Sequence, residues 1–172
     1  DGRAQFYTAE IPPVPQPMQH TAFFDPRRER PWIDFMEYTS EMTAERIMSL
    51  ARVVKEATEN RALVSACYGY TWEFSHPWSG HLALRRLLDC ADIDMLTGPI
   101  SYTERRPEES GALPGPADSI ALHGKLWMIE DDTKTHLAKP SSGIDTFNPR
   151  MENRSATQAV HMRTIGTALA HQ

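Results

Sequence analysis

Residues 125–137 read KLWMIEDDTKTHL, an apolar segment that runs directly into a cluster of acids. The bulky side chains up to Ile129 predict a strand that is buried in a core. Glu130, Asp131 and Asp132 then follow without a break. Carboxylates at the end of a buried strand are typical of α/β enzymes, whose functional groups follow the carboxyl ends of parallel strands.

Two earlier segments also predict strands, and helical patterns alternate with all three. The strand segments before residue 125 are ALVSACYGYTWEF (62–74) and DIDMLTGP (92–99). A first helix is expected from a Ser40 cap to residues 59–60, with Ile47, Leu50, Ala51 and Val54 on its inner face. Further helices are expected over 80–91 and 116–124. A last one is expected from the capping box at 155–158, with an inner face of Met162, Ile165, Gly166 and Leu169.

This alternation predicts a parallel sheet with right-handed crossovers. The loops that follow strands are long and rich in polar residues, whereas the loops before strands are tight. That asymmetry favours an α/β fold that is part of a (β/α)8 TIM barrel, comprising its late strands and helices. A doubly wound fold is the alternative, but the sequence has no glycine-rich dinucleotide or phosphate loop. The expected organisation is an extended, proline-rich lead-in over 1–38 and a partial barrel segment over 39–172.

Composition and charge exclude several classes of protein. The chain has 172 residues, of which 40% are hydrophobic and 24% charged, as in ordinary globular domains. A net charge of -5 provides no basic surface for nucleic acid, so none is expected as a partner. No apolar run approaches the roughly 20 residues that span a bilayer, so no membrane association is expected. The sequence does not begin with Met, which leaves its start and its compartment open, with a weak preference for the cytoplasm.

The two cysteines do not predict a metal or redox centre. Cys67 and Cys90 each lie beside an apolar run, where cysteine packs as a small hydrophobe, although one disulfide between them stays open. There is no CxxC pair and no paired metal-ligand spacing. No metal and no cofactor are therefore expected.

Glu130 is the first candidate catalytic residue. Trp127 and Met128 precede it, so a carboxylate here is costly unless it is hydrogen-bonded or used in chemistry. The three acids cannot all share one face, and one of them is expected to pair with Lys134, His136 or an arginine. The alternative is a solvated turn between strand and loop.

Two more segments that follow strands supply candidate binding residues for a sugar. Aromatic faces stack on sugar rings, and carboxylates and hydroxyls bind sugar hydroxyls. Tyr102 and Arg105 follow the strand at 92–99, together with Glu104 and Arg106, and solvated charges are the alternative. The candidates from the first strand, for which an aromatic core is the alternative, are Tyr68, Tyr70, Trp72 and Glu73, with His76 nearby. Asp94 is either an inward barrel group or the first strand residue, and His81 and His123 are expected to be structural.

The segments YGYTWEF, SGHLALRRLLDCADIDMLTGPISYTERR and DSIALHGKLWMIEDDTKTHL together resemble the catalytic barrel of bacterial glycoside hydrolases related to the family 42 β-galactosidases. The resemblance spans most of residues 23–137. In those enzymes a late barrel strand ends in a Met-Glu-like pair whose Glu is the nucleophile, and the matching residue here is Glu130.

The resemblance implies a retaining glycosidase with two carboxyl groups about 5–5.5 Å apart. The family places its acid/base upstream, and this chain has no residue to match it, since Glu73 lies too late to be promoted to that role. The expected function is therefore a glycosidase barrel segment that carries the nucleophile Glu130 and binds substrate through Tyr68, Tyr70, Trp72, Glu73, Tyr102, Arg105 and Asp132. A non-catalytic carbohydrate-binding or structural barrel remnant is the alternative, and a metal-dependent hydrolase is a third. The partners expected are a carbohydrate and either the rest of its own barrel or a second copy of the chain.

Overall fold

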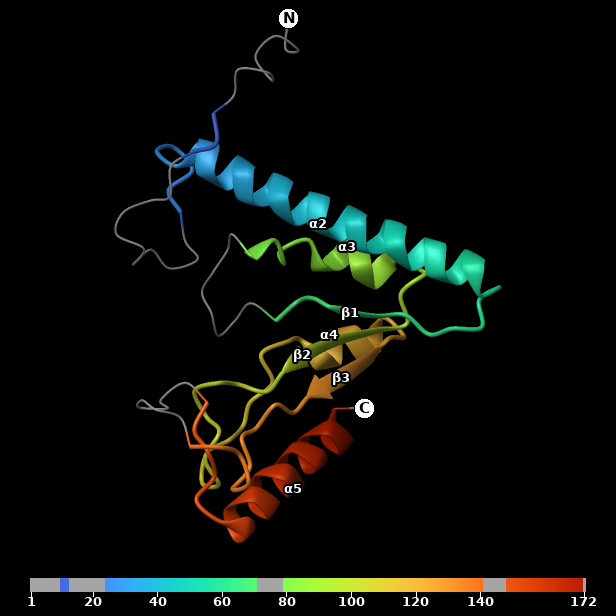
Figure 1. Cartoon of the computed structure of the whole chain (residues 1–172). Coiled ribbons are helices and arrows are strands. Elements are labelled where there is room, and N and C mark those ends of the chain that lie inside the picture. Colours follow the sequence, from blue (N-terminus) through green and yellow to red (C-terminus); the bar gives the residue numbers. More distant parts are fainter. Residues whose placement is uncertain (1–9, 13–23, 71–78, 141–147, 172) are drawn as a thin grey trace, which may run out of the picture.

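The computed structural model describes residues 10–12, 24–70, 79–140 and 148–171, and within them it is a mixed α/β structure. Helices and strands alternate along the chain, as the sequence predicts (Figure 1). None of the described helices has the length and apolar character needed to cross a bilayer. The elements are α2 (Arg30–Ala57), β1 (Ser65–Cys67), α3 (Leu84–Asp89), β2 (Met95–Pro99), α4 (Ala117–Leu122), β3 (Leu126–Glu130) and α5 (Arg154–Ala170).

The three strands form one parallel sheet in the order β1-β2-β3, which confirms the expected parallel arrangement. Ala66 lies opposite Leu96, and Leu96 lies opposite Trp127, so these three side chains share one face of the sheet. Pro99 is the register partner of Glu130 at the carboxyl end. Three parallel strands do not close a barrel, so the described residues show an α/β fold with a small parallel sheet and do not show the expected TIM barrel.

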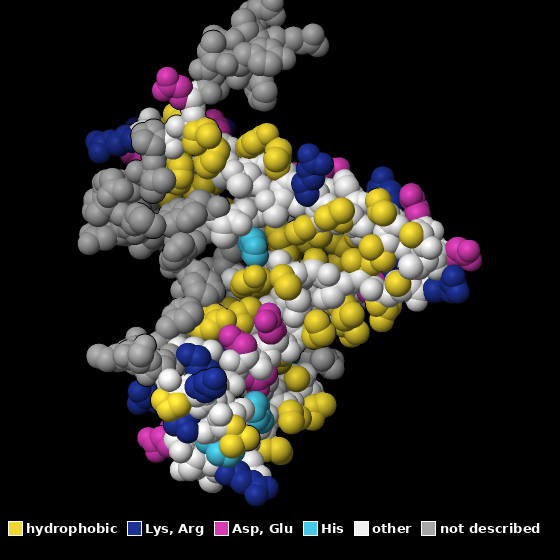
Figure 2. Space-filling view, in the orientation of Figure 1, with side chains coloured by type: hydrophobic (Ala, Val, Ile, Leu, Met, Phe, Trp, Pro, Cys, Tyr) yellow, Lys and Arg dark blue, Asp and Glu magenta, His cyan; other side chains and the backbone are white. Residues whose placement is uncertain are grey.

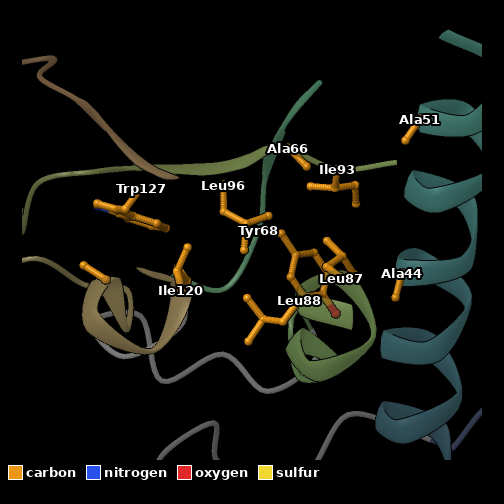
Figure 3. Packing of buried hydrophobic residues seen from close by; sticks show 11 residues of the cluster. Ala44, Ala51, Ala66, Tyr68, Leu87, Leu88, Ile93, Leu96, Ile120 and Trp127 are labelled. Atoms are coloured by element: carbon orange, nitrogen blue, oxygen red, sulfur yellow. The ribbon is translucent and has the colours of Figure 1, made fainter. Parts of the chain in front are cut away.

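The hydrophobic core lies between this face of the sheet and helices α2, α3 and α4. Figure 3 shows Leu96 and Trp127 pointing toward Leu87 and Leu88 of α3 and Ile120 of α4, with Ala44 and Ala51 of α2 at one side. Strands in sequence order with right-handed crossovers place both intervening helices on the same face. The loop after β2 also approaches the core closely, because a Cβ on Gly115 would lie 2.5 Å from Trp127 Cη2.

The opposite face of the sheet is largely open among the described residues. Side chains at alternate positions share a face, and in β3 the exposed positions alternate with the buried or half-buried ones. The open face has an apolar centre and a carboxylate at its carboxyl end. Its exposed or half-exposed residues are Ser65, Cys67, Met95, Leu126, Met128 and Glu130.

Helix α2 begins earlier than the sequence pattern suggests. It starts at Arg30 with Pro31 in its first turn, a position that tolerates proline because the missing N–H has no helical partner there. The extended lead-in therefore cannot include residues 30–38, and Ser40 lies inside the helix instead of capping it. Ala44 and Ala51 of its buried stripe belong to the hydrophobic core, whereas Leu50 and Val54 are exposed rather than inward. The stripe consists of Trp32, Met36, Ser40, Ala44, Ala51 and Lys55.

Helix α5 is rotated relative to the prediction. Asn153 caps it by accepting a hydrogen bond from the N–H of Ala156 at 2.9 Å, so the cap precedes the Ser155 box. The buried side chains are Thr157, Val160 and Thr164, whereas the predicted inner residues Met162, Ile165 and Leu169 are exposed. The helix presents its short side chains to the loops after β2 and β3, and this leaves its larger apolar side chains uncovered.

Candidate functional site

Glu130 ends β3 at the carboxyl edge of the sheet, where the sequence places the candidate nucleophile. Its side chain is exposed, and it lies on the same face as Met128, two residues earlier. No hydrogen bond or ion pair joins its carboxylate to another residue in the described part of the chain. Of the three acids in the Glu130–Asp132 cluster, only Glu130 lacks a hydrogen-bond or ion-pair partner within the described residues.

Asp131 is held by a histidine of α5. Its Oδ2 lies 2.9 Å from His161 Nδ1, and its Oδ1 accepts a hydrogen bond from the N–H of Thr133 at 3.1 Å. Burial raises the pKa of the Asp131 carboxyl, but hydrogen bonds from Thr133 and His161 outweigh this, and the net effect lowers the pKa below its ordinary value. Asp131 is thus a carboxylate that connects the end of β3 to α5.

Asp132 is held by the buried Arg105, in agreement with the expectation that one of the acids pairs with an arginine. Arg105 Nη2 lies 2.6 Å from Asp132 Oδ1, and the arginine side chain has no exposed surface. Asp132 Oδ1 makes no well-aligned hydrogen bond, so the contact is an ion pair. Tyr102 donates its hydroxyl proton to Asp132 Oδ2 at 2.8 Å, and its ring lies under the guanidinium, 3.8 Å from centroid to Cζ.

The remaining donors of Arg105 are used within the protein. Its Nε donates to the carbonyl of Ser101 and its Nη2 to that of Ile100, each at 2.9 Å, while Nη1 donates to Asn148 Oδ1 at 3.0 Å. Asn148 in turn donates to the carbonyl of Asp132 at 3.1 Å. Arg105 therefore joins the loop after β2 to the segment after β3, and its guanidinium is not exposed to a substrate.

Tyr102 is half-buried beside this ion pair. Burial raises the pKa of its hydroxyl, and the hydrogen bond to the Asp132 carboxylate raises it further, so Tyr102 remains a proton donor at neutral pH. Tyr102 and Asp132, both partly exposed, are the members of the loop cluster that can contact a ligand.

The tyrosines after β1 have different environments. Tyr68 is fully buried, accepts a hydrogen bond from the N–H of Ala83 at 3.0 Å and stacks on His81, so it is a core residue and not a platform for a sugar. Burial raises its pKa to about 12. Tyr70 is half-buried and meets His81 edge-on at 4.9 Å between ring centroids. Burial raises the pKa of the Tyr70 hydroxyl, and electrostatic repulsion from Cys67 in its thiolate form and from Glu130 raises it further.

The other predicted residues are accounted for as follows. Trp72, Glu73 and His76 lie outside the described residues. His81 packs against Tyr68 and Tyr70, and burial lowers the pKa of its imidazole. His123 accepts or donates one hydrogen bond, to the carbonyl of Ser119, within α4 and its cap.

Asp94 precedes β2 and faces α2 instead of a barrel interior. Its Oδ2 accepts hydrogen bonds at 2.6 Å from both Lys55 Nζ and the N–H of Val64. Burial raises the pKa of the Asp94 carboxyl, but these bonds outweigh it and lower the pKa overall. Asp94 therefore fastens α2 to the start of the sheet.

Two residues of the carboxyl edge gave no signal in the sequence, namely His161 and Asn148. Each contacts an acid that is more than ten positions away along the chain, so no local spacing marks it. The described residues contain no group of three or more His, Cys, Asp or Glu side chains that could hold a metal ion. Cys67 and Cys90 are both free thiols.

Comparison with known proteins gives no further assignment: no protein-family model, curated protein or solved structure matches this chain.

Proposed function

We propose that this chain is part of a (β/α)-barrel glycoside hydrolase of the retaining type and that Glu130 is its nucleophile. The observation that carries the proposal is the placement of Glu130 on the open face of the sheet, at the carboxyl end of β3. In a (β/α) barrel the helices cover the outer face of the strands, and the catalytic groups project at the carboxyl ends. Helices α2, α3 and α4 against one face, and an accessible carboxylate at the carboxyl end of the other, are consistent with that architecture. Helix α5 lies apart from these helices, across a groove from Met95 and Met128.

The residues near Glu130 in the sequence and at the ends of the neighbouring strands are of types that bind polar substrates. A glycosidase nucleophile must be a carboxylate that can reach the sugar ring, and Asp131 and Asp132 are already held by His161 and Arg105. Tyr70 supplies a half-buried aromatic ring after β1, and the charge of Glu130 contributes to the raised pKa of its hydroxyl. Tyr102 and Asp132 provide hydrogen-bonding groups of the kind that bind sugar hydroxyls. The buried Arg105 holds Asp132 in place through their ion pair.

A retaining mechanism needs a second carboxyl group about 5–5.5 Å from the nucleophile. Neither Asp131 nor Asp132 is available, because each is committed to a cationic or imidazole partner. The proposal therefore requires an acid/base from outside the described residues, contributed either by the rest of the barrel or by a second copy of the chain. The ligand proposed is a carbohydrate, with no nucleic acid and no membrane as partner.

The same observation favours a second candidate, a carbohydrate-binding module without catalysis. In that case Glu130 and Tyr70 bind a sugar, but no covalent intermediate forms. In the first candidate the carboxylate of Glu130 forms a covalent bond to the anomeric carbon, and in the second it only binds the sugar. A covalent label therefore distinguishes them.

The test is incubation with a 2-deoxy-2-fluoro-β-galactoside that carries a good leaving group, followed by peptide mass spectrometry. The proposal expects a fluorosugar ester on Glu130, which Glu130→Gln abolishes and which Asp118→Asn, an exposed control that loses the same charge, retains. A label on Asp131 or Asp132 would overturn the assignment. Saturable binding of galactose without any ester, weakened by Glu130→Gln, would establish the binding module in its place.

A further inference from the structure

A groove lies between β3 and α5, apart from the carboxylate of Glu130. Its volume is about 470 Å³, within the range of roughly 300–1,000 Å³ that is usual for small-molecule sites. Figure 2 shows exposed hydrophobic side chains over the region of β3 and α5, with histidine and acidic side chains among them. The groove residues that matter here are the apolar Met95, Leu126, Met128 and Ile165 and the polar Asp131 and His161.

Asp131 and His161 form a dyad in the wall of this groove, with 2.9 Å between Oδ2 and Nδ1. The Asp131 side chain is only 20% exposed, and its lowered pKa keeps it ionised at neutral pH. A carboxylate next to Nδ1 holds the imidazole proton on that nitrogen, which leaves Nε2 as a hydrogen-bond acceptor. The Thr164 hydroxyl, also in the wall, donates to the carbonyl of Val160 at 3.1 Å, so its proton is already used.

The charge of the dyad determines which ligand fits. With a neutral imidazole the dyad carries one negative charge, and with a protonated one its charges cancel, so neither state attracts an anion. An ammonium group would lose its hydration against the apolar walls, which is costly. A neutral alcohol can donate its hydroxyl proton to Nε2 without the cost of removing a charge from water. The apolar part of the same molecule would pack on the methionine and aliphatic side chains.

We propose that this groove binds a neutral amphipathic alcohol, whose hydroxyl donates to Nε2 of His161 and whose aryl or alkyl body packs on Met95, Leu126, Met128 and Ile165. The site does not use Glu130, but it requires that no further barrel strand pairs with β3, which is an edge strand of the described sheet. A further strand paired with β3 would fill the same space, and the experiment below distinguishes this case.

The test compares three probes of nearly equal size by calorimetry at pH 7.5: 4-propylphenol, its methyl ether 4-propylanisole, and 4-propylbenzoate. The phenol is expected to bind at least about tenfold more tightly than the other two, because a single buried hydrogen bond is worth about that factor. Methyl NMR signals of Met95 and Met128 should shift on addition of the phenol. Equal affinity for phenol and ether, or tightest binding of the benzoate, would overturn the proposal.

Variants separate the hydroxyl acceptor from the apolar body. His161→Phe keeps a ring but removes the acceptor, so the phenol should weaken to the affinity of the ether, while the ether is unaffected. Ile165→Glu should weaken all the probes, because it places a charge in the apolar wall. His123→Phe is the matched control on α4 and should change nothing. An unchanged phenol affinity in His161→Phe would refute the role of the dyad.

If no probe binds to the wild-type protein, the groove is covered and the inference fails. Fluorosugar labelling of Glu130 in the same preparation would then leave the glycosidase proposal intact. Binding of the phenol without fluorosugar labelling of Glu130 would support the groove and contradict the glycosidase proposal. The two proposals can therefore fail independently.

Discussion

Arg105 Nη2 and Asp132 Oδ1 lie 2.6 Å apart, and the arginine is fully buried while the aspartate is one-third exposed. The pair joins the loop after β2 to the segment after β3, and Asp132 lies two residues after the candidate nucleophile Glu130 in the chain. A buried cation of this kind is stable only because carbonyls and an amide satisfy its other donors. The pair and these hydrogen bonds therefore hold the two loop segments together.

Arg105→Met should destabilise the fold strongly. The change leaves the carbonyls of Ile100 and Ser101 without their Arg105 donor and removes the cationic partner of Asp132, and broken buried pairs cost about 3–5 kcal/mol. The lower end is expected because Asp132 is partly exposed and can rehydrate. Urea denaturation measures the free energy of unfolding, with the exposed neighbour Arg106→Met as the control. A loss of similar size in both variants would contradict this account.

Asp94→Asn should lower the free energy of unfolding at pH 7 by about 1–2 kcal/mol, because the amide cannot form an ion pair with Lys55. The pKa of Asp94 is lowered in the folded state, so its stabilisation is fully present above the ordinary pKa of about 3.9. It is lost as the pH falls through the lowered folded value. Urea titrations between pH 6 and pH 3 should therefore show a shallower decline for Asp94→Asn than for the wild type. Asp92→Asn, whose partner Arg52 is largely exposed, should keep the wild-type slope.

Gly98→Ala should destabilise the sheet by about 1–3 kcal/mol, the usual cost of overpacking. A Cβ at this position would lie 2.9 Å from both Trp127 Cη2 and Tyr70 Cδ1, so the two rings would have to move apart. Gly166→Ala is the opposite case, because nothing lies within 4 Å of a Cβ there and alanine favours the helix. Thermal unfolding should show a lower Tm for Gly98→Ala and a higher Tm for Gly166→Ala. A stabilising Gly98→Ala would show that the rings are less tightly packed than described.

Cys67 should react with iodoacetamide before Cys90 does. Cys67 is exposed on the open face of the sheet, whereas Cys90 is half-buried at the end of α3. Mass spectrometry of peptides after brief labelling measures the order, and Cys67→Ser should remove the fast phase. Slow labelling of Cys67 in the folded protein would indicate that the open face is covered in solution, as it would be inside a closed barrel.

Much of the fold followed from local patterns. The apolar run before Glu130 and the tight turn before that run predicted strand β3 and its parallel pairing, because both are features of consecutive residues. The expectation that this strand is buried in the core was wrong, because Leu126 and Met128 are exposed on the open face of the sheet. Helix faces were less predictable. In α5 the large side chains of Met162 and Ile165 suggested an inner face, but the small Thr157 and Val160 are buried against the neighbouring loops.

In the candidate site, too, some features follow from the sequence and others only from the tertiary structure. The sequence by itself determined that Glu130, Asp131 and Asp132 follow a strand, since strand and acids are adjacent in the chain. Only the tertiary structure decided that Asp131 meets His161, that Asp132 meets Arg105 and that Glu130 is left exposed. The physical reason is that the partners of Asp131 and Asp132 are brought to them by the packing of loops and α5 against the edge of the sheet. These partners are so far away along the chain that no sequence periodicity predicts the contacts.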